Sequence, residues 1–176
     1  GLVSDDQLVD SFPALGLLMS GKHTEIVYVK EPGVYEKLGQ TLDDAAGEAF
    51  DKVGRVLNLG YPGGPVVTEF AKRGKQGVIT FTTPMKNSND LNFSYSGLKT
   101  AALYKSKELR EQGIPEREWI YDFCRGFLDA VIDSVVIKLK KGIEANPEVK
   151  TVFVGGGVFN SEEILRRVGT VVRSYN

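Results

Sequence analysis

The sequence predicts an α/β fold, a mixed β-sheet with flanking helices, from three observations. A buried apolar strand over residues 14–19 is followed by a strand over residues 25–30 in which side-chain character alternates. Apolar residues then recur at helical spacing, most continuously over residues 116–145. A last apolar strand over residues 149–154 passes through a glycine turn into a helix over residues 161–168. A hairpin, then helices, then a further strand and helix is an element order typical of a layered α/β domain.

Turn residues and apolar spacing place the remaining elements. The sequence predicts a third strand over residues 34–41 and a short strand over residues 78–81, followed by a polar loop. Helices are expected over residues 42–57, 65–73 and 97–112. This order fits the RNase H-like core of the actin-type ATPases, formed by a single domain over residues 1–176.

Two helix starts carry recognisable capping residues. Thr41 with Asp44 three residues later approximates a capping box for the first helix, and Ser96 is suited to cap the helix at 97–112. Asn160, with Glu163 three residues later, forms the same pattern before the last helix.

Composition excludes several classes of protein. The 176 residues are 41% hydrophobic and 26% charged, which is typical of a folded domain and not of a disordered chain. No apolar run approaches the roughly 20 residues of a membrane span, and the formal net charge is −1, so the chain as a whole does not attract nucleic acid. The one cysteine, Cys124, lies in a helical pattern and predicts a buried thiol in a reducing compartment. We therefore expect a cytoplasmic protein with no membrane partner.

The helix at 42–57 and the turn after it are the most informative segment. An apolar stripe at helical spacing, which includes Leu42, predicts its buried face, and Asp44, Glu48, Asp51 and Arg55 share another face. The segment 61-YPGGP-65 follows, and it would let a ligand approach bare backbone. Two interpretations remain open here: a solvated surface pair of Asp51 with Arg55, or a carboxylate site for the hydroxyls of a ribose.

Four motifs in this chain resemble the TsaD family of tRNA adenosine threonylcarbamoyltransferases. They are SGKHT after the first strand, GEAFDK with YPGGP, LNFSYSGLKT, and VFVGGGVFN near the end of the chain. The resemblance implies the second lobe of a two-lobed actin-like ATPase fold, with the first lobe and the C-terminal end of the family absent from this sequence. It also implies that one Fe or Zn ion per subunit is held by residues outside this chain, which supplies no metal ligands.

The resemblance assigns a nucleotide site residue by residue. Asp51 would accept hydrogen bonds from a ribose, Gly64 would allow close approach to the backbone, and Asn160 would contact the substrate. The predicted substrate-binding set is Leu18, Met19, Ser20, Gly21, Lys22, Asp51, Gly64 and Asn160, with Glu48, Gly155 and Gly156 as further candidates. No catalytic residue is assigned.

Some positions depart from the family or have a structural alternative. The family usually has a second glycine where this chain has Lys22, so Lys22 either strains the loop at positive φ or places an ammonium beside a phosphate. His23, the only histidine, is more typical of a structural residue than of a metal ligand. A basic stripe on the helix at 97–112 predicts a solvated face, with tRNA backbone contact as the alternative. Its members are Lys99, Lys105, Lys107 and Arg110.

The function implied is transfer of a threonylcarbamoyl group from threonylcarbamoyl-AMP to N6 of adenosine 37 in tRNA. This chain would supply the nucleotide-binding lobe, with ATP or threonylcarbamoyl-AMP as ligand, and would work with tRNA, a paralogous scaffold subunit and an ATPase subunit. One alternative is a non-catalytic actin-like nucleotide-binding or scaffold lobe. Another is a different actin-fold enzyme, such as a sugar kinase or a carbamoyltransferase with a different substrate. The chain alone is expected to be incomplete for catalysis.

Overall fold

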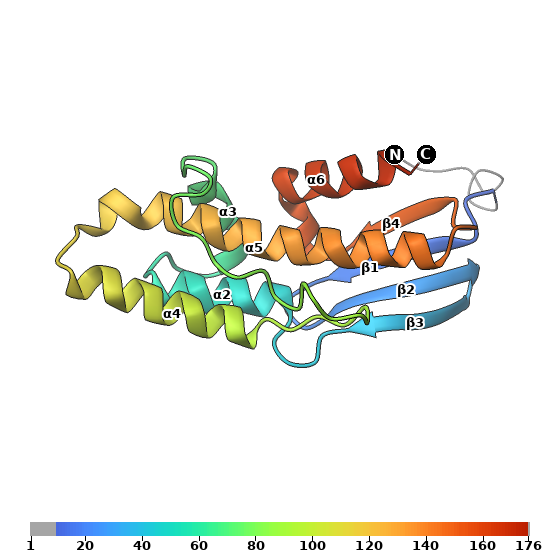
Figure 1. Ribbon diagram of the computed structural model, residues 1–176, viewed down its shortest axis with the longest axis horizontal. Helices are drawn as coiled ribbons and strands as arrows, with labels where there is room; N and C mark the ends of the chain where they lie inside the picture. Colours follow the sequence, from blue (N-terminus) through green and yellow to red (C-terminus); the bar gives the residue numbers. More distant parts are fainter. Residues whose placement is uncertain (1–9, 176) are drawn as a thin grey trace.

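A four-stranded mixed sheet forms one end of the molecule in the computed structural model, which describes residues 10–175 (Figure 1). The strands are β1 (Ala14–Met19), β2 (Thr24–Glu31), β3 (Val34–Gln40) and β4 (Thr151–Gly155), in the order β3-β2-β1-β4. β2 is antiparallel to β1 and to β3, whereas β4 is parallel to β1. The predicted fold class, α/β with a mixed sheet and flanking helices, is confirmed.

Helices lie along the sheet and extend the molecule beyond it (Figure 1). They are α2 (Ala46–Val56), α3 (Gly63–Ala71), α4 (Ser96–Glu111), α5 (Glu116–Ala145) and α6 (Glu162–Arg173), with a short 3-10 helix, η1 (Gly157–Asn160), before α6. Figure 1 shows α5 running along both parts, from the sheet to the end where α2, α3 and α4 gather. α3 and α6 both pack on α5, and α2 packs on α3 and α4.

The hydrophobic core joins the sheet to these helices. Every residue of β1 except Leu18 is buried, as expected for a strand in the middle of a sheet. Phe127 of α5 meets Phe50 of α2 edge to face, with ring centroids 5.4 Å apart, and Phe81 packs in the same way on Phe123. This packing holds α2, and the turn that follows it, against the centre of α5.

The first helix begins later than the sequence predicts. α2 starts at Ala46, its first free N–H is bound by Thr24 Oγ1 of β2 at 2.9 Å, and Leu42 is 62% exposed instead of buried. Thr41 Oγ1 does bond locally, donating to the Asp44 carbonyl at 2.7 Å, but it does so in the loop before the helix. The predicted capping box is therefore wrong, because the cap comes from a neighbouring strand.

Residues 78–81 form a turn and irregular chain where the sequence predicts a short strand. Phe81 packs on Phe123 and Phe127 of α5 instead of extending the sheet, whereas Val78 is exposed. Ile79 is buried, and its backbone approaches α5 so closely that a Cβ on Gly126 would lie 2.9 Å from the Ile79 carbonyl carbon. The apolar pattern indicated the burial of Ile79 correctly, but it did not indicate that Val78 is exposed or that the packing partner is a helix.

The start of α4 is capped from a distant segment. Asp43 accepts hydrogen bonds from the N–H groups of Tyr95 and Ser96 at 2.8 and 3.2 Å, and from the hydroxyls of Ser94 and Ser96 at 2.5 and 2.6 Å. Ser96 is the first residue of the helix and donates to Asp43, so its predicted role as the cap is wrong. The polar groups of the SYSG motif thus converge on one carboxylate.

Candidate functional site

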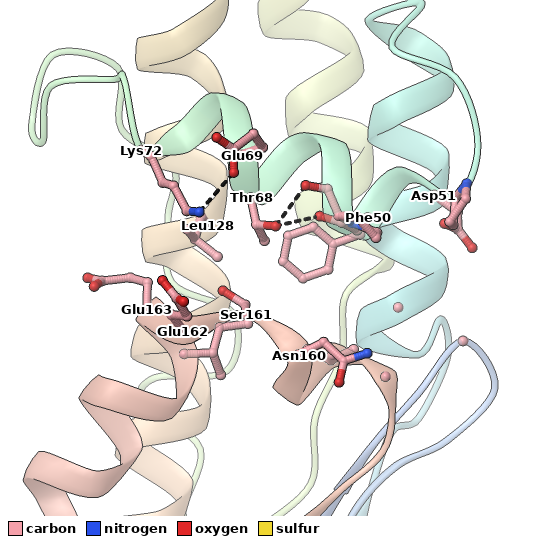
Figure 2. A pocket seen from close by; sticks show the side chains of 18 of the residues that line it. Phe50, Asp51, Thr68, Glu69, Lys72, Leu128, Asn160, Ser161, Glu162 and Glu163 are labelled. Atoms are coloured by element: carbon pink, nitrogen blue, oxygen red, sulfur yellow. Dashed lines mark hydrogen bonds and ion pairs between the residues drawn. The ribbon is translucent and has the colours of Figure 1, made fainter.

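A cavity of about 770 Å³ opens between α2, α3 and the start of α6 (Figure 2). Its floor is apolar and comes from Phe50, Leu128 and Ile164, all of which are buried. Polar side chains surround this floor, with Asp51 and Asn160 toward one end and Glu69, Lys72, Glu162 and Glu163 toward the other. An apolar floor with a few polar groups at its edge is typical of a small-molecule site.

Asp51 is fixed by the turn that it faces. The Gly63 N–H donates to Asp51 Oδ1 at 2.7 Å, which caps the start of α3. A Cβ on Gly63 would lie 2.7 Å from the Asp51 Cα, so glycine is required where α3 crosses α2. Asp51 Oδ2 is the second acceptor of the carboxylate, and it has no hydrogen-bond partner within residues 10–175. The carboxylate is therefore oriented by one oxygen and open at the other.

Gly64 lies on the cavity wall with space in front of it. A Cβ added there would touch only the Phe50 Cβ among the described residues, at 4.0 Å, so it would project into the cavity and not into the core. Thr68 lies one turn further along α3 and also lines the cavity, but its hydroxyl is directed to the carbonyls of Gly64 and Pro65 at 2.9 and 3.0 Å.

The β1–β2 turn reaches the cavity through Gly21 alone among the five residues predicted there. Ser20 shapes the turn, because its hydroxyl accepts the N–H groups of Lys22 and His23 at 3.2 and 3.0 Å. The Met19 side chain is fully buried, and Leu18 is partly exposed. Gly47 donates to the Ser20 carbonyl at 3.1 Å, which docks the turn on the start of α2.

Lys22 is exposed and occupies ordinary backbone conformation. The non-glycine residues with positive φ in the described chain are Asn58 and Met85. The strained interpretation of Lys22 is therefore wrong. The alternative, an ammonium beside a phosphate, stays a prediction.

Asn160 is the last residue of η1 and lines the cavity. The N-cap of α6 is Ser161, so the predicted capping role of Asn160 is wrong. Gly155 ends β4, and Gly156 has φ 98° and lies against β1, where a Cβ would be 2.7 Å from the Met19 carbonyl carbon. These two glycines pack the strand and lie outside the cavity lining.

The far end of the cavity holds charges that the sequence did not indicate. Arg125 of α5 lines the cavity, and Asp129 one turn later holds it through Nε at 3.0 Å and Nη2 at 2.9 Å. Glu163 accepts from the same Nη2 at 3.4 Å. Ion pairs with Arg166 and Arg125 outweigh the effect of burial, and they hold the pKa of Glu163 below its usual value. The spacing of Arg125 and Asp129 on a largely apolar helix is the signal that could have found this pair.

Residues 1–175 match a family model described as TsaD, tRNA N6-adenosine threonylcarbamoyltransferase. The match covers nearly the whole sequence. The chain belongs to the TsaD family.

Curated TsaD relatives support the assignment. The chain is 48% identical over 151 residues to proteins of Burkholderia pseudomallei (strain 1106a) and Burkholderia mallei (strain ATCC 23344), each named tRNA N6-adenosine threonylcarbamoyltransferase. Each alignment covers 84% of this chain and 43% of the relative. A Burkholderia vietnamiensis protein of the same name is 45% identical over 157 residues, 86% of this chain. The chain thus spans less than half the length of these TsaD relatives.

The carboxylates that the sequence placed on one face of the predicted helix at 42–57 separate in the structure. Asp44 and Glu48 bind Lys52 at 2.9 and 2.6 Å on the side toward α4, and Glu48 lies outside the cavity lining. Asp51 faces the cavity, where it binds the Gly63 N–H, so the interpretation as a solvated pair with Arg55 is wrong. Of the predicted TsaD site residues, the structure brings Gly21, Asp51, Gly64 and Asn160 to one cavity.

The basic stripe of α4 is neutralised residue by residue. Lys99 pairs with Asp44 at 2.9 Å, and Arg110 pairs with Glu116 at 2.7 Å. Lys105 and Lys107 pair within α4, with Glu108 at 3.1 Å and Glu111 at 3.7 Å. For the outer part of the helix this favours the solvated face over the phosphate contact.

Two further expectations concern the thiol, from the helical pattern around it, and the metal, from the TsaD resemblance. Cys124 is a free, buried cysteine, as predicted, and burial raises the pKa of its thiol to about 12. Within residues 10–175, no three His, Cys, Asp or Glu side chains lie close enough together to share a metal ion. The Fe or Zn ion that the resemblance implies therefore has no fitting site in the described part of the chain.

None of the helices in that part is long and apolar enough to cross a membrane.

Proposed function

We propose that this chain supplies the nucleotide-binding lobe for the transfer of a threonylcarbamoyl group from threonylcarbamoyl-AMP to N6 of adenosine 37 in tRNA. The observation that carries the proposal is the meeting of three separate motifs around one cavity. Gly21 comes from the first strand turn, Asp51 and Gly64 from the helix and its glycine turn, and Asn160 from the last glycine segment. Family membership and the names of the relatives support the same reaction.

The cavity suggests how an adenylate would lie. The ribose hydroxyls would donate to Asp51 Oδ2, because Oδ1 is already occupied by the Gly63 N–H at 2.7 Å. The base would lie between α3 and α6 on the apolar floor of Phe50, Leu128 and Ile164. The phosphate would lie toward Gly21 and Asn160, where backbone N–H groups and a side-chain amide can donate.

The proposed reaction is an acyl transfer from a mixed anhydride. N6 of adenosine forms a bond to the carbonyl carbon of the threonylcarbamoyl group, the bond from that carbon to the phosphate oxygen breaks, and AMP leaves with the electron pair. The N6 proton is lost to solvent or to the leaving phosphate. Because the amine is weakly nucleophilic, catalysis depends on holding the two reactants and stabilising negative charge on the leaving phosphate.

The residues of this chain would bind and orient the donor without forming a covalent intermediate. Cys124 is buried in α5 and its pKa is raised to about 12, so it stays a protonated thiol at neutral pH. The paralogous scaffold subunit, the ATPase subunit and a cytoplasmic location belong to the proposal for the whole enzyme.

The proposal is tested by calorimetric titration of this chain with ATP and with a non-hydrolysable threonylcarbamoyl-AMP analogue. Wild type should bind, and Asp51→Asn should bind at least tenfold more weakly, because a hydrogen bond to a charged acceptor contributes about 1.5 to 3 kcal/mol. The asparagine keeps one oxygen for the Gly63 N–H, so the fold is retained. Asp51→Ala removes that acceptor as well, and thermal unfolding of both variants separates the two effects.

Equal nucleotide affinity for wild type and Asp51→Asn would contradict the proposed ribose contact. Failure of wild type to bind either ligand would favour the alternative of a non-catalytic scaffold lobe.

A further inference from the structure

A second hollow, a groove of about 470 Å³, lies between α2 and α4 on the other side of α2 from the cavity. Its walls are Lys52, Arg55 and Val56 of α2 and Lys99, Thr100 and Leu103 of α4. We call this set the α2–α4 groove. Three of the six side chains are cations, whereas none of the six is acidic.

The groove is held open at both ends by contacts between its walls. At one end, Asp44 binds Lys52 of α2 and Lys99 of α4, each at 2.9 Å. At the other end, Arg110 of α4 donates to the Val56 carbonyl of α2 at 3.0 Å. The spacing of the two helices is therefore set before any ligand arrives, which reduces the ordering cost of binding.

The two lysines are restrained but still reachable. Their side chains keep 33% and 31% of their surface exposed beside the shared Asp44 carboxylate. A lysine ammonium has three N–H donors. Lys99 uses one of them on Asp44, and Lys52 uses two, on Asp44 and Glu48, so each retains a donor for a further acceptor. Leu103, which is half exposed, and Val56 are the apolar residues of the groove lining.

Arg55 is the uncompensated charge of the groove. It is exposed in the last turn of α2, and within residues 10–175 its guanidinium has neither an ion pair nor a hydrogen bond. Its neighbours Lys52, Lys99 and Arg110 are all paired with carboxylates. A guanidinium in this state offers a planar set of donors that matches the geometry of a phosphate.

We propose that the α2–α4 groove binds the phosphate backbone of an RNA, with Arg55 and the lysines as phosphate contacts. The proposal rests on the proposed function for the identity of the RNA as tRNA. Cations on both walls with an apolar strip between them fit a phosphate–sugar chain, and Thr100 adds a small polar group. Asp51 and Lys52 are consecutive residues that line the cavity and the groove, so α2 alone, about 10 Å wide, separates the two.

The test measures binding of a fluorescently labelled, unmodified tRNA transcript to this chain by fluorescence anisotropy. The titration is repeated at salt concentrations between about 50 and 200 mM. Arg55→Ala should weaken binding and lower the slope of log Kd against log salt by about one, because one phosphate contact is lost. Arg55→Lys keeps the charge and should keep the slope. The loss should be the same factor for an RNA of unrelated sequence, since backbone contacts carry no sequence information.

Lys107→Ala is the matched control. It removes one cation from α4, but Lys107 is 70% exposed and lies outside the groove. Its slope and affinity should equal those of wild type. Equal losses for Lys107→Ala and Arg55→Ala, an unchanged slope for Arg55→Ala, or absence of tRNA binding by wild type at low salt would each overturn the proposal.

Nucleotide titration of the same variants separates this proposal from the previous one. Arg55→Ala should bind ATP as wild type does, because Arg55 lies outside the cavity. Loss of ATP binding in Asp51→Asn with an unchanged tRNA slope would leave the groove supported. If the wild-type protein binds tRNA through Arg55 but does not bind ATP, only the assignment of the cavity as a nucleotide site is refuted.

Discussion

The two sides of α2 carry the same kinds of side chain in different states. Toward α4, Lys52 binds Glu48 and also Asp44, which lies in the loop just before α2, and Asp44 binds Lys99 as well. Toward α3, Asp51 is bound by a single backbone N–H at 2.7 Å. Carboxylates in ion pairs with the lysines of two helices hold those helices together. A carboxylate that is oriented through one oxygen can still accept a hydrogen bond from a ligand at the other. Helical spacing alone does not separate these cases, because the difference lies in what the neighbouring helix supplies.

The largest effects are expected from substitutions of the two glycines that face α2, Gly63 and Gly64. Gly63→Ala should lower the free energy of unfolding by about 3 kcal/mol, because its Cβ would lie 2.7 Å from the Asp51 Cα and force α2 and α3 apart. Gly64→Ala should unfold at nearly the wild-type urea concentration but bind ATP more weakly, because its Cβ projects into the cavity.

Urea unfolding and calorimetry on both glycine variants check this pair. A Gly64→Ala protein that is destabilised as much as Gly63→Ala would show that Gly64 serves packing. Unchanged ATP affinity in a folded Gly64→Ala protein would remove Gly64 from the site.

Removing the distant cap of α4 should have a smaller effect on stability. Asp43→Ala loses the acceptor of two N–H groups and two hydroxyls, and should lower the free energy of unfolding by about 1 to 2 kcal/mol. Burial opposes ionisation of Asp43, but hydrogen bonds from Ser94, Ser96 and Tyr95 outweigh it and hold its pKa below the ordinary 3.8.

The pH dependence of this effect follows from the lowered pKa. A lowered pKa in the folded state contributes stability that is present above pH 3.8 and is lost as pH falls through the folded pKa. The stability difference between wild type and Asp43→Ala should therefore be constant near neutral pH and shrink below about pH 4. Chemical unfolding at several pH values tests this, and a difference that grows on acidification would contradict it.

The smallest effect is expected on the lysine-bound side of α2. Glu48 is 41% exposed in its pair with Lys52, so Glu48→Ala should change stability by less than about 0.5 kcal/mol. It should leave ATP affinity unchanged, in contrast to Asp51→Asn. A clear loss of ATP binding in Glu48→Ala would mean that Glu48 as well as Asp51 contacts the ligand.

Much of the architecture was predictable because local pattern and burial agree. β1 and α5 have the bounds that the apolar pattern predicts, residues 14–19 and 116–145. The errors occur at element ends and in one apolar segment. Thr24 caps α2, Asp43 caps α4, and residues 78–81 pack on α5, and each of these contacts joins segments far apart in sequence. Local signals identify a group that needs a partner, but they do not identify the partner.

The candidate site divides in the same way. Asp51, Gly64, Asn160 and Gly21 were singled out from motifs, and all four line the cavity. Arg125 and Thr68 also line the cavity, but the sequence did not predict them as site residues. Each lies in a helix whose local pattern predicts only buried or solvent-exposed positions. Gly155 and Gly156 were candidates for ligand contact, yet they pack β4 and the following turn against β1.

The α/β class, the extents of the most apolar elements and family membership could be predicted from the sequence, because they depend on the order and periodicity of residues. Tertiary contacts set which carboxylate stays open, which cation stays unpaired and which segment caps which helix. Those outcomes depend on the distances between groups from separate elements, as between Asp51 and Gly63 or between Asp44 and Lys99. A charge or a hydrogen-bonding group acquires its role only when folding places its partner.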